Sequence, residues 1–275
     1  MIPVLFRIGP IPINSYGLML VTGFIFGYFL LSWEYRDRGV SVDFASTEIT
    51  LGMIGAIVGS RIFHVLEHLD AYSLDHIERL FKGSGFSWYG GFVMVSILVL
   101  WYAHRKGIRW TTVVDATSPG TAIGYGFGRI GCFLSGDGCY GEPCSVLHLT
   151  WPAPFCMAFP NGAVPTSEVV LNTPIIEVFG AVFTFAVLML LRRPLIKRPA
   201  SLFAVFVIMH GIMRFMIEYV RLNPKFGPFS QAQWVSICAV AIGVWLLARP
   251  PAPDPEPALV QGKKKNKKRQ ATSTT

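Results

Sequence analysis

Arginines inside apolar stretches are the residues of this sequence that point most directly to chemistry. Arg129 lies in the glycine-rich stretch 120–141, and Arg61 and Arg214 lie in two other apolar stretches. A charge in such a setting is expensive, so it usually serves an anion or a partner. Arginine suits phosphate because its planar guanidinium presents a fork of donors to the phosphate oxygens. We therefore expect an anion site around Arg129.

The stretch that carries Arg129 also has a face without side chains. Gly120, Gly124 and Gly128 recur every four residues. On a helix, this spacing lines one face with glycine and lets another helix or a ligand approach closely.

The composition is typical of an integral membrane protein. The 275 residues are 52% hydrophobic and only 15% charged, a balance that soluble domains do not show. The net charge of +8 does not indicate nucleic-acid binding, because six of the basic residues lie together in 263–269. The N-terminus has no basic region followed by an apolar run and a cleavage site, so we do not expect a signal peptide.

The hydrophobic pattern predicts an all-α polytopic membrane protein with seven transmembrane helices, each of about 20 mostly apolar residues. The transmembrane domain is expected over 1–248, with an outer loop at 136–172, and a Pro/Lys-rich disordered cytoplasmic tail over 249–275. A short amphipathic helix is expected at 76–81. The seven spans are expected at about 14–33, 46–67, 87–104, 112–135, 173–191, 201–220 and 229–248.

Basic residues in the short loops predict the orientation. They concentrate after the first, third and fifth spans and in the tail, whereas the loop 136–172 contains no Lys or Arg. The positive-inside rule therefore places the N-terminus outside and the C-terminus in the cytoplasm.

In this orientation the polar residues of six helices fall in one layer, in the outer half of the membrane. Arginines outnumber acids in that layer, which favours an external anion, and the obvious anion at this depth is a lipid phosphate. The layer contains Tyr16, Arg61, Tyr89, Arg129, Glu177, Arg214 and Glu218.

Structural explanations compete for several of these residues. Arg214 and Glu218 stand four residues apart and could neutralise each other as a helical ion pair. Glu177 could form an architectural ion pair with any of the arginines. Tyr16 could belong to the aromatic belt at the membrane interface. For Gly59 we favour helix packing over chemistry.

The remaining polar residues favour structural roles. Glu48 and Asp115 fall near inner helix ends, and His64 and His210 are read first as satisfied core histidines. For the cysteines of the outer loop, an oxidising compartment would allow a disulfide. A metal site is the weaker reading, because ligands at a recognisable spacing are missing. These cysteines are Cys139, Cys144 and Cys156.

One segment resembles a known family signature. Gly128-Arg-Ile-Gly-Cys-Phe-Leu-Ser-Gly136 is similar to the pattern G-R-x-G-N-F-x-N-G of bacterial prolipoprotein diacylglyceryl transferases. Further matches follow in order along nearly the whole membrane part, each on its expected helix. They are Ser15-Tyr-Gly-Leu-Met19, Gly59-Ser-Arg61, Tyr89-Gly-Gly91, Pro174-Ile-Ile-Glu177 and Arg214-Phe-Met-Ile-Glu218 with Arg221.

The resemblance implies an enzyme of the bacterial cytoplasmic (inner) membrane. Such enzymes transfer the diacylglyceryl group of phosphatidylglycerol to the lipobox cysteine thiol of prolipoproteins and release glycerol phosphate. The partners are then phosphatidylglycerol and prolipoprotein signal peptides. No metal, nucleotide or other cofactor is implied.

The resemblance also implies roles for single residues. Arg129 and Arg214 would contact the phosphate, oriented by Glu218 and Glu177. Arg61 is a second candidate for the phosphate. Catalytic roles also fall to Tyr16, which would position the headgroup or thiol, and to Tyr89, while Gly128, Gly131, Cys132 and Gly136 of the signature would line the substrate site.

Three positions depart from the family pattern. Cys132 and Ser135 replace the two asparagines of the signature, and Tyr89 replaces a histidine that is a proposed base. Tyrosine, with a pKa of about 10, is a poor base at neutral pH. The proton acceptor is therefore unassigned. A non-catalytic lipid-binding paralogue is the main alternative, followed by an anion transporter, for which the expected internal repeat is missing.

Overall fold

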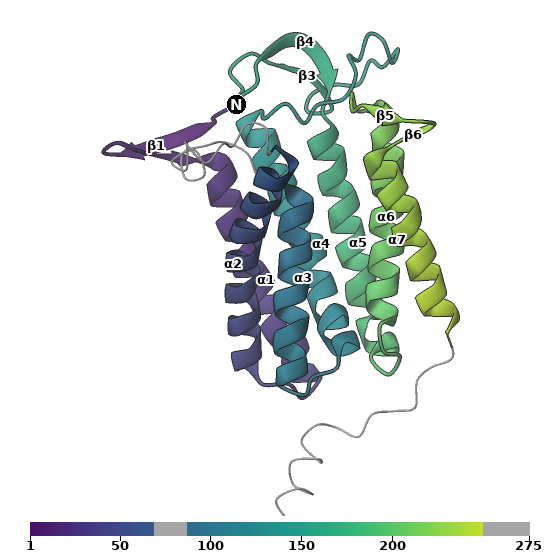
Figure 1. Cartoon of the computed structure of the whole chain (residues 1–275). Coiled ribbons are helices and arrows are strands. Elements are labelled where there is room, and N and C mark those ends of the chain that lie inside the picture. Colours follow the sequence, from purple (N-terminus) through teal and green to yellow (C-terminus); the bar gives the residue numbers. More distant parts are fainter. Residues whose placement is uncertain (69–86, 250–275) are drawn as a thin grey trace, which may run out of the picture. The chain divides into compact units, whose positions relative to one another are not determined.

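The structure is a computed structural model that describes residues 1–68 and 87–249 (Figure 1). The predicted helix at 76–81 and nearly all of the predicted tail lie outside the described residues. The described part has seven α-helices, and each coincides with a predicted span. They are α1 (Ser15–Asp37), α2 (Val42–Glu67), α3 (Trp88–Arg105), α4 (Trp110–Ser135), α5 (Thr173–Leu195), α6 (Ser201–Ile217) and α7 (Gln231–Ala248).

Five of these helices are long and apolar enough to cross a membrane: α1, α2, α5, α6 with its 3-10 extension Glu218–Val220, and α7. Their outward faces carry large apolar side chains, and Phe183 and Leu190 of α5 are 65% and 77% exposed. An exposed apolar surface of this kind suits contact with lipid rather than water. The chain is therefore a mostly helical, multi-pass membrane protein.

The prediction of an all-α fold missed three two-stranded antiparallel hairpins. They are β1–β2 (Val4–Ile8, Ile11–Asn14), β3–β4 (Cys156–Phe159, Thr166–Leu171) and β5–β6 (Lys225–Phe226, Phe229–Ser230). Two of them turn on a Gly-Pro pair whose glycine, Gly9 or Gly227, has a φ of 59° or 71°, as tight hairpins require. Strands this short leave no trace in a search for ~20-residue apolar runs.

The described chain forms two compact units. The first comprises residues 1–31 and 114–249, and the second comprises residues 32–68 and 87–113. The boundaries fall inside α1 and α4. The prediction of one transmembrane domain over 1–248 stays a prediction.

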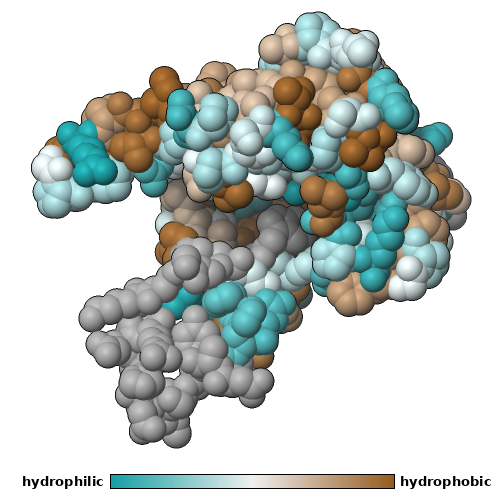
Figure 2. All heavy atoms as spheres, turned by 90° about the horizontal axis from the view of Figure 1, so that it is seen from above, coloured by the Kyte–Doolittle hydropathy of each residue, from teal (hydrophilic) through white to brown (hydrophobic). Residues whose placement is uncertain are grey.

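In the first unit, the three hairpins stand at one end of the helices (Figure 1). Seen from that end, hydrophilic and hydrophobic residues are interspersed on the surface (Figure 2). At the opposite end, both carboxylate oxygens of buried Asp115 accept hydrogen bonds of 2.8 Å, from the backbone N–H groups of Ala200 and Phe203. Asp115 thus satisfies free donors at the start of α6, which confirms its structural role.

The glycine face of α4 meets α1 within this unit. A methyl group added to Gly120 would lie 3.5 Å from the carbonyl oxygen of Gly27, and one added to Gly23 would lie 3.6 Å from that of Gly124. α1 and α4 therefore lie close together at the first two glycines of the face, but a methyl group at Gly120 would make only ordinary van der Waals contact and one at Gly124 would meet no described atom within 4 Å.

In the second unit, α2 and α3 touch through their backbones. A Cβ atom at Gly59 would lie 2.5 Å from the carbonyl oxygen of Gly90, and one at Gly90 would lie 2.4 Å from that of Gly59. This mutual contact confirms that Gly59 serves helix packing. Glu48 of α2 is buried and accepts a hydrogen bond from the Tyr35 hydroxyl, so its role is structural too.

The α2–α3 contact yields a matched test of packing. Gly59→Ala is expected to destabilise the protein by about 1–3 kcal/mol, because backbone on the facing helix must move. Gly52→Ala on the same helix is the control, since its Cβ would meet no described atom within 4 Å. In thermal unfolding in detergent, we expect a lower midpoint temperature for Gly59→Ala and an unchanged one for Gly52→Ala. Equal midpoints for the two variants would contradict the close contact.

The loop 136–172 is closed by a disulfide between Cys144 and Cys156, one of the pairings that its cysteines allowed. Around it lies a small apolar cluster that includes Leu171. Cys139, the third cysteine of the loop, is free. The cluster also includes Ile176 of α5 and Val220, so the loop packs against the start of α5 and the segment that follows α6.

Candidate active site

Glu177 is the centre of the site. Asn172 caps the start of α5 by accepting the backbone N–H of Ile175, and Pro174 stands at the first helical positions, where its missing N–H costs nothing. Glu177 follows in the first turns of α5, and its side chain is 0% exposed. A carboxylate buried this completely needs charged or hydrogen-bonding partners.

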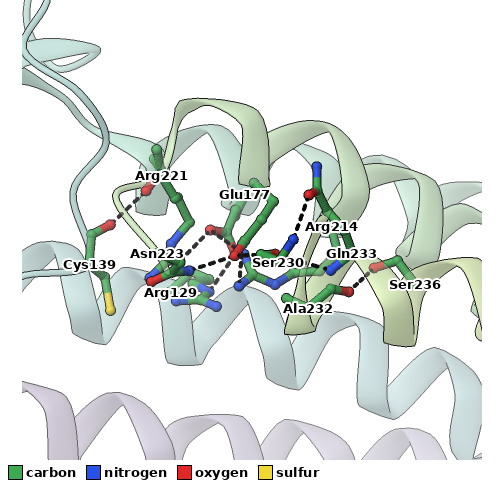
Figure 3. Close-up of polar contacts among 12 residues, drawn as sticks. Arg129, Cys139, Glu177, Arg214, Arg221, Asn223, Ser230, Ala232, Gln233 and Ser236 are labelled. Atoms are coloured by element: carbon green, nitrogen blue, oxygen red, sulfur yellow. Dashed lines mark hydrogen bonds and ion pairs between the residues drawn. The ribbon is translucent and has the colours of Figure 1, made fainter. Parts of the chain in front are cut away.

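Three arginines surround that carboxylate (Figure 3). Arg129 Nε lies 2.7 Å from Glu177 Oε2, Arg221 Nη1 lies 3.2 Å from Oε1, and Arg214 Nη1 lies 4.0 Å from Oε1. The Tyr125 hydroxyl also donates a hydrogen bond to Oε2. Residues from α4, α5, α6 and the segment after α6 therefore meet at one carboxylate.

Arg129 is held on three sides. Its guanidinium carbon lies 4.9 Å from the centre of the Tyr125 ring, as in a cation–π contact. On its other side, Nη1 lies 3.9 Å from Cys132 Sγ. Together with the ion pair to Glu177, these contacts fix the direction of the guanidinium.

Glu218 is a second buried carboxylate in the same cluster. Its Oε2 lies 2.8 Å from Arg214 Nη2, which confirms the predicted pair at i,i+4. Its Oε1 accepts hydrogen bonds from Asn223 Nδ2 at 2.7 Å and from Ser230 Oγ at 2.8 Å. Ser230 also caps α7, so Glu218 connects Arg214 to the β5–β6 hairpin.

The cluster has a surplus positive charge on its accessible side. Three arginines contact two carboxylates, so one cationic charge is left over. The carboxylates are at most 1% exposed, whereas the side chains of Arg129, Arg214 and Arg221 are 16%, 20% and 12% exposed. Any molecule that reaches the cluster therefore meets arginine side chains before carboxylates, and the planar donors of arginine suit phosphate oxygens.

Comparisons with known proteins identify the family to which this site belongs. Residues 3–249 match the family model of prolipoprotein diacylglyceryl transferase. A phosphatidylglycerol–prolipoprotein diacylglyceryl transferase of Geobacter sulfurreducens is 32% identical over 254 residues, which cover 88% of this chain and 92% of that protein. Proteins of the same name from Leptospira interrogans and Clostridium tetani are each 28% identical and cover 86% and 89% of this chain, and 88% and 96% of their own lengths. The chain belongs to the prolipoprotein diacylglyceryl transferase family.

The structure places the family signature at the end of α4 and in the turn after it. Beside Arg129, a methyl group on Gly128 would meet no described atom within 4 Å, which leaves room for a ligand. Gly131 packs on α1, since its Cβ would lie 3.0 Å from Tyr16 Cδ2. Gly136 has a φ of 61°, and its Cβ would lie 2.7 Å from Gly162 Cα. At Gly136 only glycine fits.

Two of the predicted site residues lie outside the first compact unit, which contains the arginine cluster. Arg61 is on α2 and Tyr89 is on α3, both half-buried, in the second compact unit. Their predicted roles stay predictions. Tyr16 is in the first unit, at the start of α1, and is 40% exposed.

Several members of the cluster were not predicted from the sequence. Tyr125 precedes Arg129 by four residues, so helical spacing could have placed both on one face. Arg221 was part of the sixth-helix match but received no role. Asn223 and Ser230 carry no such signal, because only the β5–β6 hairpin brings them to Glu218.

Cys132 and Cys139 meet at the edge of the site. Cys132 is buried in the last turns of α4, and Cys139 is half-buried in the loop. A hydrogen bond with the Cys132 thiol lowers the pKa of the Cys139 thiol below its usual range. Of the two thiols, Cys139 is therefore the more readily ionised.

Proposed function

We propose that this protein is a phosphatidylglycerol–prolipoprotein diacylglyceryl transferase. The lipobox cysteine, as a thiolate, attacks the glycerol carbon next to the phosphate. A carbon–sulfur bond forms, the carbon–oxygen bond to the phosphate breaks, and glycerol phosphate leaves. The observation that carries the proposal is the cluster of partly exposed arginine side chains around buried Glu177, in a chain of this family.

The cluster suits this reaction because negative charge builds on the leaving phosphate. Donors that are fixed in advance stabilise such charge without reorganising during the reaction, and one such donor is typically worth 10²–10³-fold in rate. We assign Arg129 and Arg214 to the phosphate, with Arg221 beside them. Glu177 and Glu218 hold the arginines in place and are positioning residues.

The other signature residues complete the substrate site. Gly128 leaves space for the lipid headgroup beside Arg129, while Gly131, Cys132 and Gly136 shape the wall of the site. We retain Tyr16 for positioning the headgroup or thiol. From the second unit, Arg61 and Tyr89 are proposed as a further phosphate contact and as a catalytic residue.

We further propose seven spans, an outside N-terminus and a cytoplasmic tail, in the bacterial inner membrane. The support is the distribution of basic residues and the position of the site at the end of α4 that leads into the loop 136–172, which has no Lys or Arg. A cavity of about 260 Å³ in this region is lined by Arg221 and Tyr140, so a peptide could approach the cluster from the loop. Trypsin should cut the tail in inverted vesicles but not in intact spheroplasts; the reverse result would overturn the orientation.

Transfer is tested with the full chain in liposomes of phosphatidylglycerol and a lipobox peptide. We expect the peptide to gain the mass of one diacylglyceryl group and glycerol phosphate to appear in equal amount. A peptide with the lipobox cysteine replaced by serine is the control. Rescue of a strain depleted of its own transferase is the corresponding test in cells. No mass gain and no rescue would exclude the transferase.

A lipid-binding paralogue without activity is the second candidate, favoured by Tyr89 and Cys132 at positions where the family has other residues. It predicts that phosphatidylglycerol binds but that no transfer occurs, even in Tyr89→His. Transfer by the unmodified chain would eliminate it.

A further inference from the structure

The turn after α4 brings three possible metal ligands together. The Sγ atoms of Cys132 and Cys139 and a carboxylate oxygen of Asp137 all lie within 4.8 Å of one another. Gly136 and Gly138, with φ of 61° and 87°, let the chain fold back on the helix end. The backbone N–H of Cys139 donates to Asp137 Oδ1 at 3.1 Å, which fixes the carboxylate beside the thiols. Sequence spacing alone did not indicate this group.

The donor types suit a tetrahedral zinc ion. Zinc binds sulfur at about 2.3 Å and carboxylate oxygen at about 2.0–2.2 Å, so its ligand atoms stand roughly 3.3–3.8 Å apart. The three donors, which lie within 4.8 Å of one another, would close to that spacing around the ion. Two thiolates and a carboxylate carry three negative charges, which outweigh the repulsion of Zn²⁺ by Arg129, whose Nη1 is 3.9 Å from Cys132 Sγ.

The alternative for two neighbouring thiols is a disulfide. Cys144 and Cys156 of the same loop are bonded in this way, but Cys132 and Cys139 are both free. A disulfide would also leave Asp137 without a role in the group. The carboxylate as third donor therefore favours a metal site.

We propose that Cys132, Asp137 and Cys139 bind a zinc ion whose fourth position takes the thiol of the acceptor peptide. Three protein ligands with one open position are the pattern of catalytic zinc sites. Cys132 is only 7% exposed, whereas Asp137 and Cys139 are half-buried. The open fourth position would therefore face the side of Asp137 and Cys139, where a peptide can approach. The role of the fourth position rests on the proposed transferase function.

This site would supply the activation that the sequence leaves unassigned. A thiol that coordinates zinc is deprotonated outright, and its proton passes to water. The sulfur electron pair then forms the carbon–sulfur bond, and the electrons of the broken carbon–oxygen bond leave with glycerol phosphate. Zinc changes no oxidation state. No histidine base is then needed at the position of Tyr89.

The metal site is tested first without any reaction. The full chain is purified in detergent under reducing conditions, equilibrated with Zn²⁺, desalted and analysed for metal. Because His64, Glu67 and His68 form a second group of possible ligands, the measurements use a His64→Gln/His68→Gln background. We expect one zinc per chain, and a thiolate-to-cobalt charge-transfer absorption when Co²⁺ is used instead.

Cys132→Ser, Cys139→Ser and Asp137→Asn should each weaken zinc binding by at least the ~10–100-fold that loss of a supporting residue typically costs. Cys238→Ser is the control, since Cys238 is an exposed free thiol on α7. Absence of zinc from the reduced protein would overturn the proposal. So would a Cys132–Cys139 disulfide in protein taken from its native membrane.

The role in transfer is tested with a chelator. We expect treatment to abolish transfer to the lipobox peptide and added Zn²⁺ to restore it. Transfer that survives complete removal of zinc would overturn the role of the fourth position. If zinc binds but the untreated protein transfers nothing, the proposed function fails and the metal site itself is upheld.

Discussion

Arg129→Ala is expected to lower the transfer rate at least about 10²-fold. The guanidinium is fixed by Glu177 and by the face of Tyr125, and it lies beside the open space at Gly128. Its removal takes away one fixed donor and also the surplus positive charge, since two arginines would then face two carboxylates. Both changes weaken binding of the leaving phosphate in the transition state.

Three measurements separate this role from loss of folding. The rate of mass gain of a lipobox peptide reports transfer, binding of phosphatidylglycerol reports the ground state, and thermal unfolding reports the fold. Arg129→Lys keeps the charge but loses the planar fork of donors, so we expect it to restore folding but not the rate. Arg193→Ala, an exposed arginine at the other end of α5, should change none of the three. An unchanged rate in Arg129→Ala would remove Arg129 from the reaction.

The helices of this protein were predictable because a helix that crosses a bilayer needs a run of about 20 mostly apolar residues, and such runs can be found in the sequence. Five of the seven described helices are long and apolar enough to cross a bilayer. All seven described helices coincide with such runs. The hairpins were not predictable in this way: β5 and β6 have two residues each, and a Gly-Pro turn alone does not say which strand pairs with which.

The sequence predicted which residues lie at the same level along the helices, but not which of them contact one another. Counting along the helices placed Arg129, Glu177, Arg214 and Glu218 at one level, and these four do form one cluster. Glu177 could not be identified as the centre of the cluster, because helical spacing does not show which carboxylate the arginines share. Site residues that lie in turns and hairpins were not predicted at all. Cys132 and Cys139 meet only because the chain reverses after α4.

Glu177→Gln is expected to cost about 3–5 kcal/mol of folding stability, as loss of one partner in a buried ion pair typically does. Glu177 contacts three arginines and accepts the Tyr125 hydroxyl, and it is fully buried. A neutral amide leaves the guanidinium groups of Arg129 and Arg221 without a counter-charge on that side. We also expect transfer to be lost, because the arginines then repel one another out of position.

The measurement is the free energy of unfolding in detergent, with Glu168→Gln as the control for stability because Glu168 is exposed on β4. The double variant Glu177→Gln/Arg221→Gln tests the cause. If uncompensated positive charge destabilises Glu177→Gln, removing one cation should recover part of the loss, so the two effects will not add. If the double variant is less stable by the sum of the single losses, the network is not held by charge balance. Recovery of stability without recovery of transfer would show that Glu177 also aims the arginines at the phosphate.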